Sequence, residues 1–168
     1  MDVSTAIMDR DGTILAQAAH QPAHLGSLLG ITTRLLETHS LADIRPGDLF
    51  IGNDAYEGGG THLNDIVFIE PVFVDGSIVA WITNIAHHAD FVDRGTAHIF
   101  QEGLRIPPVR LYAEGVIQKD VLDLVLLNCT YNVICNRFVF LRHGECLIFN
   151  AFAKSRQNKS VVSNSCLV

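Results

Sequence analysis

Two β-prone runs joined by a two-residue turn constrain the fold of this chain more than any other feature. Residues 66–74 and 77–86 are rich in valine, isoleucine and aromatic side chains, and Asp75-Gly76 separates them. An Asp-Gly pair between two such runs is typical of a tight antiparallel hairpin, because both residues tolerate positive φ angles. A hairpin of this length brings the residues before 66 close to the residues after 86.

Shorter patterns on both sides of this hairpin predict the remaining elements. Residues 4–17 hold two β-prone runs around Asp11-Gly12, which is a second hairpin signal. Leucines recur at helical spacing in residues 27–39, where Ser27 is placed as an N-cap. A short strand is predicted at 49–51 and a second helix at 118–128. The predicted fold class is mixed α/β (α+β), with antiparallel β-hairpins packed against one or two helices.

The composition excludes several functional classes. With 168 residues and 48% hydrophobic side chains the chain can bury the core of one domain. A net charge of −6 gives no basic face for nucleic acid, and no apolar run approaches the roughly 18–20 residues that span a bilayer. The first residues lack the layout of a signal peptide. We therefore expect a cytoplasmic protein whose partners include neither nucleic acid nor membrane.

The charge changes abruptly near residue 129. Residues 1–129 carry 7 Lys and Arg against 17 Asp and Glu, whereas residues 130–168 carry 5 against 1. Of the 13 glycines, only Gly144 lies in the second segment. The second segment also lacks a clear periodicity, which predicts a disordered end or foreign sequence rather than a second domain.

Two groups of histidines and carboxylates flank the central hairpin. His62 and Asp65 precede its first strand, and His87, His88 and Asp90 follow at the end of its second. Antiparallel pairing brings these two ends together. Imidazole nitrogens combined with carboxylate oxygens suit a divalent ion such as Mn, Fe or Zn. The alternative is that these histidines lie at the surface or in the core without binding a metal.

The geometry of a regular strand limits which of these residues bind one ion. Neighbours such as His87 and His88 point to opposite faces, whereas His88 and Asp90 share a face. Both histidines can bind the same ion only if the backbone leaves the strand pattern there. Otherwise one is a ligand, and its neighbour supports the ligands or contacts the substrate.

Other catalytic motifs are missing. Gly58-Gly59-Gly60 belongs to neither G-x-x-x-x-G-K-[ST] nor G-x-G-x-x-G, and the first lysine is Lys119. A glycine run of this kind more often allows the backbone to approach another segment closely. The sequence has no G-x-S-x-G, and its four cysteines form no C-x-x-C pair and lie far from the histidine groups. Nucleotide binding by this chain and covalent nucleophilic catalysis are therefore not expected.

Several separated motifs resemble one enzyme family. GDLFIGNDAYEGGGTHLNDIVFIEPVFVDGSIVAWITNIAHHAD (47–90), followed by QEGLRIPPVRLY (101–112), is similar to the N-terminal part of the hydantoinase B/oxoprolinase family. AQAAHQPAHLGS (16–27) also resembles it, with His20 and His24 in matching places. The family includes N-methylhydantoinase B subunits, 5-oxoprolinases and subunits of acetone and acetophenone carboxylases. The resemblance covers residues 2–129, and the motifs occur in order with plausible spacing.

The resemblance implies ATP-dependent chemistry on a cyclic amide or ketone. In such systems an A-type subunit or domain binds ATP and activates the substrate by phosphorylation. The B part then completes ring opening by water, or carboxylation in the carboxylase branch. The missing phosphate loop agrees with ATP being handled by the other component.

The resemblance also implies a divalent metal ion (Mn, Zn or Fe) and the residues that serve it. The predicted metal ligands are His62, Asp65, His87, His88 and Asp90. The predicted catalytic residues are His62, His87, His88 and Asp90. The ion would polarise a carbonyl or phosphoryl oxygen, or activate water. The predicted substrate-binding residues are Asp54 and Arg105, with Arg110 as a further candidate to steady an anionic group; plain surface charge is the alternative for both arginines.

Three departures from the family pattern predict a fragment of a larger catalytic domain. Family subunits are several times longer, and residues 91–100 replace a longer loop. The resemblance also ends near Asn128-Cys129, where the charge changes. We expect residues 1–129 to be a partial hydantoinase B/oxoprolinase-like domain and residues 130–168 to be a divergent tail that is not native to the family.

The predicted function is that of a truncated B subunit of an ATP-dependent cyclic-amide hydrolase, inactive alone. Its predicted partners are an A-type ATP-binding subunit or domain and a small-molecule substrate such as a hydantoin or 5-oxoproline. One alternative is a fragment of an ATP-dependent ketone carboxylase subunit. Another is a non-catalytic remnant that still binds the A subunit.

Overall fold

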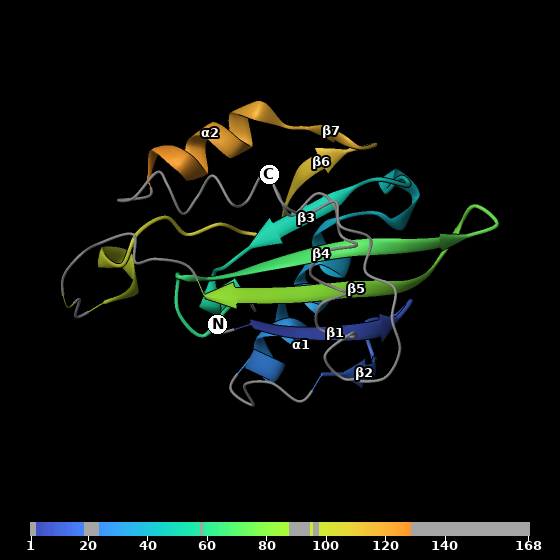
Figure 1. The fold of residues 1–168 in the computed structure, drawn as a ribbon, viewed down its shortest axis with the longest axis horizontal. Coiled ribbons are helices and arrows are strands. Elements are labelled where there is room, and N and C mark those ends of the chain that lie inside the picture. Colours follow the sequence, from blue (N-terminus) through green and yellow to red (C-terminus); the bar gives the residue numbers. More distant parts are fainter. Residues whose placement is uncertain (1–2, 19–23, 58, 88–94, 96–97, 129–168) are drawn as a thin grey trace, which may run out of the picture.

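The protein is built on one antiparallel β-sheet flanked by two helices (Figure 1). The structure, a computed structural model, describes residues 3–18, 24–57, 59–87, 95 and 98–128. Its seven strands are arranged in the order β2-β1-β5-β4-β3-β6-β7. They are β1 (Val3–Asp9), β2 (Ile14–Gln17), β3 (Leu49–Gly52), β4 (Asp65–Val74), β5 (Ser77–His87), β6 (Val109–Ala113) and β7 (Val116–Ile117). The helices are α1 (His24–Thr38) and α2 (Lys119–Leu127), with short 3-10 helices η1 (Leu41–Asp43), η2 (Ala55–Glu57) and η3 (Ile99–Gln101). This confirms the mixed α/β fold with antiparallel hairpins.

The predicted central hairpin is the β4–β5 pair. Its turn residues Asp75 and Gly76 have φ angles of 49° and 76°, and Val74 pairs with Ser77 across the turn. Positive φ at both central residues is the signature of a type I′ turn, whose twist matches that of the two strands. Each strand extends one residue beyond the predicted range, to Asp65 and His87, which pair directly.

The two faces of β4 pack against different helices. Val67 and Ile69 face the core beneath α1, which also contains Leu28, Leu35 and Trp81. Ile66 and Phe68 point the other way, into the core that includes Val125 of α2. Alternation of side chains along a strand produces this division. Burial on both faces also explains why β4 reads as a nearly continuous apolar run rather than as an alternating one.

Helix α1 begins earlier than predicted. It starts at His24, so Ser27 lies inside the helix, buried, and its prediction as an N-cap is wrong. The first turn packs against β1, where the His24 ring contacts Ser4. A contact between residues 20 positions apart leaves no local signal in the sequence. Helix α2 falls within the predicted 118–128.

The small β1–β2 hairpin confirms the second turn signal. Asp9 Oδ1 accepts hydrogen bonds from the backbone N–H groups of Asp11 and Thr13, at 3.0 and 2.8 Å. Gly12 takes a φ of 87°, which favours glycine. In the described part of the chain, the helices are all too short or too polar to cross a membrane.

Candidate metal centre

Asp65 and His87 meet where β4 begins and β5 ends. They are directly opposite in the strand register, and His87 Nδ1 lies 3.1 Å from Asp65 Oδ1. Residues directly opposite in an antiparallel pair have their Cβ atoms about 4.5–5.5 Å apart, so the two side chains can bind the same metal ion. The hairpin therefore joins the two polar groups as the sequence predicted.

His62 completes a group of three. Its Nε2 lies 3.5 Å from Asp65 Oδ2, and its ring centroid lies 4.9 Å from that of His87 with the planes tilted by 47°. One ligand atom from each residue lies within 4.8 Å of the others. Among the described residues, this is the one group of at least three His, Cys, Asp or Glu side chains with that spacing.

The three side chains differ in burial: the carboxylate is enclosed by the protein, and the two imidazoles are partly exposed to solvent. The Asp65 side chain is 1% exposed, whereas those of His62 and His87 are 39% and 37% exposed. The two imidazoles can therefore be reached from solvent, whereas the carboxylate cannot. Two nitrogens and one oxygen fit Mn, Fe or Zn, with room for further ligands.

The surroundings of Asp65 favour its charged form. Burial alone would raise the pKa of this carboxyl group. The hydrogen bond from Thr61 Oγ1, the bond with His87 and the charges of His62 and His24 outweigh burial and hold the pKa below its usual value. Asp65 is therefore a carboxylate at neutral pH, as a metal ligand must be.

The loop before β4 comes close to Asp65 at Gly60 and close to Asp54 at Gly59. A Cβ atom on Gly60 would lie 2.5 Å from the backbone oxygen and 2.6 Å from the Cβ of Asp65. A Cβ on Gly59 would lie 2.4 Å from the backbone nitrogen of Asp54. Both glycines have the role that the sequence favoured for this run, the close approach of one backbone segment to another.

Asn53 ties the loops around the group together, although the sequence showed it only as a neighbour of Asp54. Its buried side-chain amide donates to the carbonyl oxygens of Leu63 and Leu104, at 2.7 and 3.0 Å. Its Oδ1 accepts from the backbone nitrogen of Ile106 at 2.7 Å. The segment that carries His62 is thereby fastened to the segment before β6.

The two predicted substrate-binding residues contact each other. Arg105 Nε and Nη2 lie 2.8 and 2.6 Å from Asp54 Oδ2. The guanidinium carbon lies 5.6 Å from the ring centre of Tyr56 and 4.9 Å from that of Phe100, both exposed rings. Arg105 is thus held in place next to the loop of the metal group, and its contact with a substrate stays a prediction.

Three other predicted residues lie elsewhere or outside the described part. Arg110 is on β6, where its Nε lies 3.1 Å from Oδ2 of the buried Asp48. His88 and Asp90 fall outside the described residues, so their predicted roles as ligands stay predictions. Thr61 and His24, which act on Asp65, were missed as site residues. A threonine directly before His62 was the available signal for Thr61.

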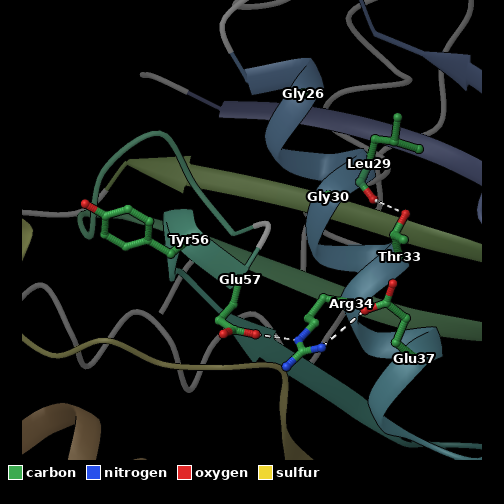
Figure 2. A pocket seen from close by; sticks show the side chains of 8 residues that line it. All are labelled: Gly26, Leu29, Gly30, Thr33, Arg34, Glu37, Tyr56 and Glu57. Carbon is green, nitrogen blue, oxygen red and sulfur yellow. Dashed lines mark hydrogen bonds and ion pairs between the residues drawn. The ribbon is translucent and has the colours of Figure 1, made fainter.

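A separate open groove lies along α1 and η2 (Figure 2). It has a volume of about 580 Å³, and Arg34 crosses it to bond Glu57 and Glu37, at 2.5 and 3.2 Å. None of the three grouped residues lines it. The charged side chains of this groove are paired with one another, whereas the potential metal ligands lie at the end of the β4–β5 hairpin.

Comparisons with known proteins agree on one family. The model of the hydantoinase B/oxoprolinase family matches residues 1–152. The uncharacterized protein MJ0963 of Methanocaldococcus jannaschii is 37% identical over 138 residues, which are 76% of this chain and 24% of that protein. The beta subunit of caprolactamase from Pseudomonas jessenii is 32% identical over 155 residues, 88% of this chain and 26% of the subunit.

The fold is also that of a solved member. The crystal structure of the ATP-dependent caprolactamase from Pseudomonas jessenii matches with a TM-score of 0.75 and 30% identity, over 92% of this chain and 28% of that one. The chain thus spans about a quarter of the length of these relatives. With a family model that matches most of its residues, this chain belongs to the hydantoinase B/oxoprolinase family.

Proposed function

We propose that this chain binds a divalent metal ion through His62, Asp65 and His87 and supplies this centre to an ATP-dependent hydrolase of cyclic amides. The observation that carries the proposal is the grouping of their ligand atoms within 4.8 Å. The three residues come from a loop and two strand ends, and the hairpin and the glycine run are what bring them together. His88 and Asp90 are proposed as additional ligands or substrate contacts.

The family supports the reaction type. Among the relatives with a named substrate is a caprolactamase, an ATP-dependent enzyme whose substrate is by its name a cyclic amide. The present sequence has no phosphate-binding loop of the G-x-x-x-x-G-K-[ST] type. The proposal therefore assigns ATP binding to a separate A-type subunit or domain, and a cytoplasmic location, where such a complex would find ATP.

The residues of the centre have separable tasks. A bound divalent ion would polarise the carbonyl or phosphoryl oxygen of an activated substrate. Asp65 anchors the site from below, and the bond from Thr61 fixes its carboxylate. His62 and His87 are exposed by more than a third and can meet both ion and substrate. Arg105, fixed by Asp54, is proposed to face the charged part of the substrate from the neighbouring loop.

The chain by itself is assigned metal binding rather than turnover. It spans about a quarter of the length of the relatives, so the ATP-dependent step is assigned to the larger assembly. Hydantoins and 5-oxoproline are the proposed substrates because the cyclic amide is the shared chemistry. Which metal is held follows from measurement rather than from the donor set, because two nitrogens and one oxygen suit Mn, Fe and Zn alike.

The first test measures the metal content of the chain. The chain is purified after growth with Mn, Fe and Zn, and its metal content is determined by mass spectrometry, beside the His62→Ala plus His87→Ala variant. About one ion per chain in the wild type and none in the variant is expected. A wild-type chain that holds no metal, or a variant that keeps it, contradicts the proposal.

The assigned reaction is tested with the assembled enzyme. The enzyme is assembled from an A-type subunit and a full-length B subunit of the family, with or without alanine at the histidines that match His62 and His87. ATP-dependent opening of 5-oxoproline, a hydantoin or caprolactam is then followed. Loss of ring opening supports the hydrolase. Bicarbonate-dependent consumption of a ketone would instead favour the carboxylase alternative.

A further inference from the structure

We infer that His24, held in place by Ser4, is a positioning residue of the metal centre: it lies over the same face and the same end of the sheet as Asp65 and His87, and it sets how tightly the ligands bind the ion without being a ligand itself. The inference rests on the proposed metal-binding function.

The strand register places Ser4 close to the ligands. On β1, Ser4 is directly opposite Ile85 of β5, and Ile85 is opposite Val67 of β4. Asp65 and His87 lie two residues from Val67 and Ile85, respectively. Because side chains alternate along a strand, Ser4, Asp65 and His87 all project from the same face of the sheet, at the same end.

That face is the one covered by α1, and His24 is the first residue of the helix. Val67 and Ile85 pack in one core with Leu28 of α1, which identifies the covered face. The His24 ring, 4% exposed, lies with its Nδ1 3.1 Å from Oγ of Ser4, which is fully buried. The first turn of α1 is thereby fastened above the end of the sheet where the ligands lie.

His24 lies at the same end of the sheet as the ligands, through its contact with Ser4, but it stays outside the ligand group. The group of mutually close ligand atoms contains only His62, Asp65 and His87 among the described residues.

The His24–Ser4 pair is buried beside an apolar core, and it places an imidazole there. The apolar part of the layer between α1 and the sheet includes Leu28, Val67 and Trp81, and Thr32 and Thr83 are buried polar residues of α1 and β5. Burying an imidazole and a hydroxyl there is costly unless both are bonded, and apolar side chains of similar size would pack without that requirement. Groups that contact metal ligands from outside typically change metal affinity by about 10- to 100-fold when removed.

The test compares Mn²⁺ binding by the 168-residue chain and its variants, with free Mn²⁺ followed by electron paramagnetic resonance. His24→Ala is expected to weaken binding by about tenfold. Ser4→Ala, which only releases the ring, should weaken binding by roughly threefold, as for the loss of one hydrogen bond between neutral groups. His24→Gln, which keeps a polar group in place, should fall between the wild type and His24→Ala.

The matched control is His39→Ala. His39 follows the other end of α1, where its ring stacks edge-on against Phe50 at 5.0 Å. Its removal should leave Mn²⁺ affinity unchanged. Circular dichroism and thermal unfolding confirm that each variant is folded, and if His24→Ala does not fold, Ser4→Ala decides the question.

Counting the nitrogen ligands of bound Mn²⁺ by pulsed electron paramagnetic resonance separates positioning from ligation. The same number in the wild type and in His24→Ala, together with weaker binding, supports the inference. Unchanged affinity in folded His24→Ala and Ser4→Ala variants overturns it, and so does the loss of one nitrogen in His24→Ala, which would make His24 a ligand. A wild-type chain that binds no Mn²⁺, Fe²⁺ or Zn²⁺ would contradict the proposed function instead.

Discussion

Asp65 and His87 are 22 residues apart in the sequence, yet they face each other across the open end of the β4–β5 hairpin with Oδ1 and Nδ1 3.1 Å apart. Their meeting depends on the turn at the far end of the hairpin. The ladder between the two ends is antiparallel, with one irregularity between Val72 and Phe73. The turn, the loop before β4 and the Asn53 clamp (the side-chain hydrogen bonds of Asn53 to Leu63, Leu104 and Ile106) are therefore parts of the site as well as of the fold.

Replacing Gly76 should destabilise the hairpin through backbone strain alone. Its φ is 76°, and a Cβ atom at this position would meet nothing within 4 Å. Gly76→Val should lower the free energy of unfolding by about 1–2 kcal/mol, as expected for a branched residue in the left-handed region. Urea denaturation measures the change. Gly76→Asn is the control, and it should lose clearly less, because asparagine tolerates this conformation.

Replacing Gly60 should damage the metal group more than the fold. The added Cβ of Gly60→Ala would press on both the backbone oxygen and the Cβ of Asp65, so the carboxylate has to shift. We expect at least a tenfold loss of Mn²⁺ affinity, comparable to removing a group that supports the ligands. Gly26→Ala is the matched control. Its Cβ enters open space on α1, so metal affinity should be unchanged and stability equal or slightly higher. Equal affinity in the two variants would show that the close approach at Gly60 is irrelevant to the site.

Removing the Asn53 clamp should loosen both loops. Asn53→Ala loses three side-chain hydrogen bonds, to Leu63, Leu104 and Ile106, in a fully buried place. With about 1 kcal/mol for each bond, the expected loss of unfolding free energy is about 3 kcal/mol. Hydrogen exchange should show faster exchange at the Ile106 amide, which bonds Asn53 Oδ1. An unchanged exchange rate at Ile106 would contradict the clamp.

The Asp54–Arg105 pair should contribute to stability whether or not it also binds substrate. Asp54 is 5% exposed and Arg105 31%, so Arg105→Ala leaves a nearly buried carboxylate without its cation. We expect a loss of about 1–3 kcal/mol. A double-mutant cycle with Asp54→Ala measures the coupling, and additive effects of the two substitutions would mean that the pair contributes no interaction energy.

The pH dependence of stability should include a contribution from Glu70. Burial raises the pKa of this half-buried carboxyl group on β4 above the unfolded value. The folded state therefore holds its proton more tightly, which stabilises the fold below the unfolded pKa. This stability is lost as the pH rises through the folded pKa. Glu70→Gln should be more stable than the wild type at pH 7, with the difference fading at acidic pH. The exposed Asp11→Asn serves as the control, and an identical pH profile for the wild type and Glu70→Gln would refute the effect.

Local patterns predicted the elements that local physics determines. The Asp75-Gly76 turn, the Asp11-Gly12 turn and the leucine spacing of α1 each depend on neighbours within a few residues, and each prediction is confirmed. The joining of His62, Asp65 and His87 was also predictable, because a hairpin makes distant ends adjacent by geometry.

What the sequence could not supply depends on distant contacts. The strand order, with β1 beside β5 and β3 between β4 and β6, leaves no signature in any one segment. The His24 side chain, at the start of α1, contacts Ser4, 20 residues earlier, and Asn53 bonds carbonyl oxygens 10 and 51 residues away. The division of the chain at residue 129 stays a prediction, and residues 129–168 lie outside the described part.

The most direct test of the metal centre is a crystal of this chain grown with Zn²⁺ and measured on both sides of the zinc absorption edge. We predict one strong anomalous peak with His62, Asp65 and His87 each about 2.0–2.2 Å from the ion. A peak bound by other residues, or none near these three side chains, would contradict the account.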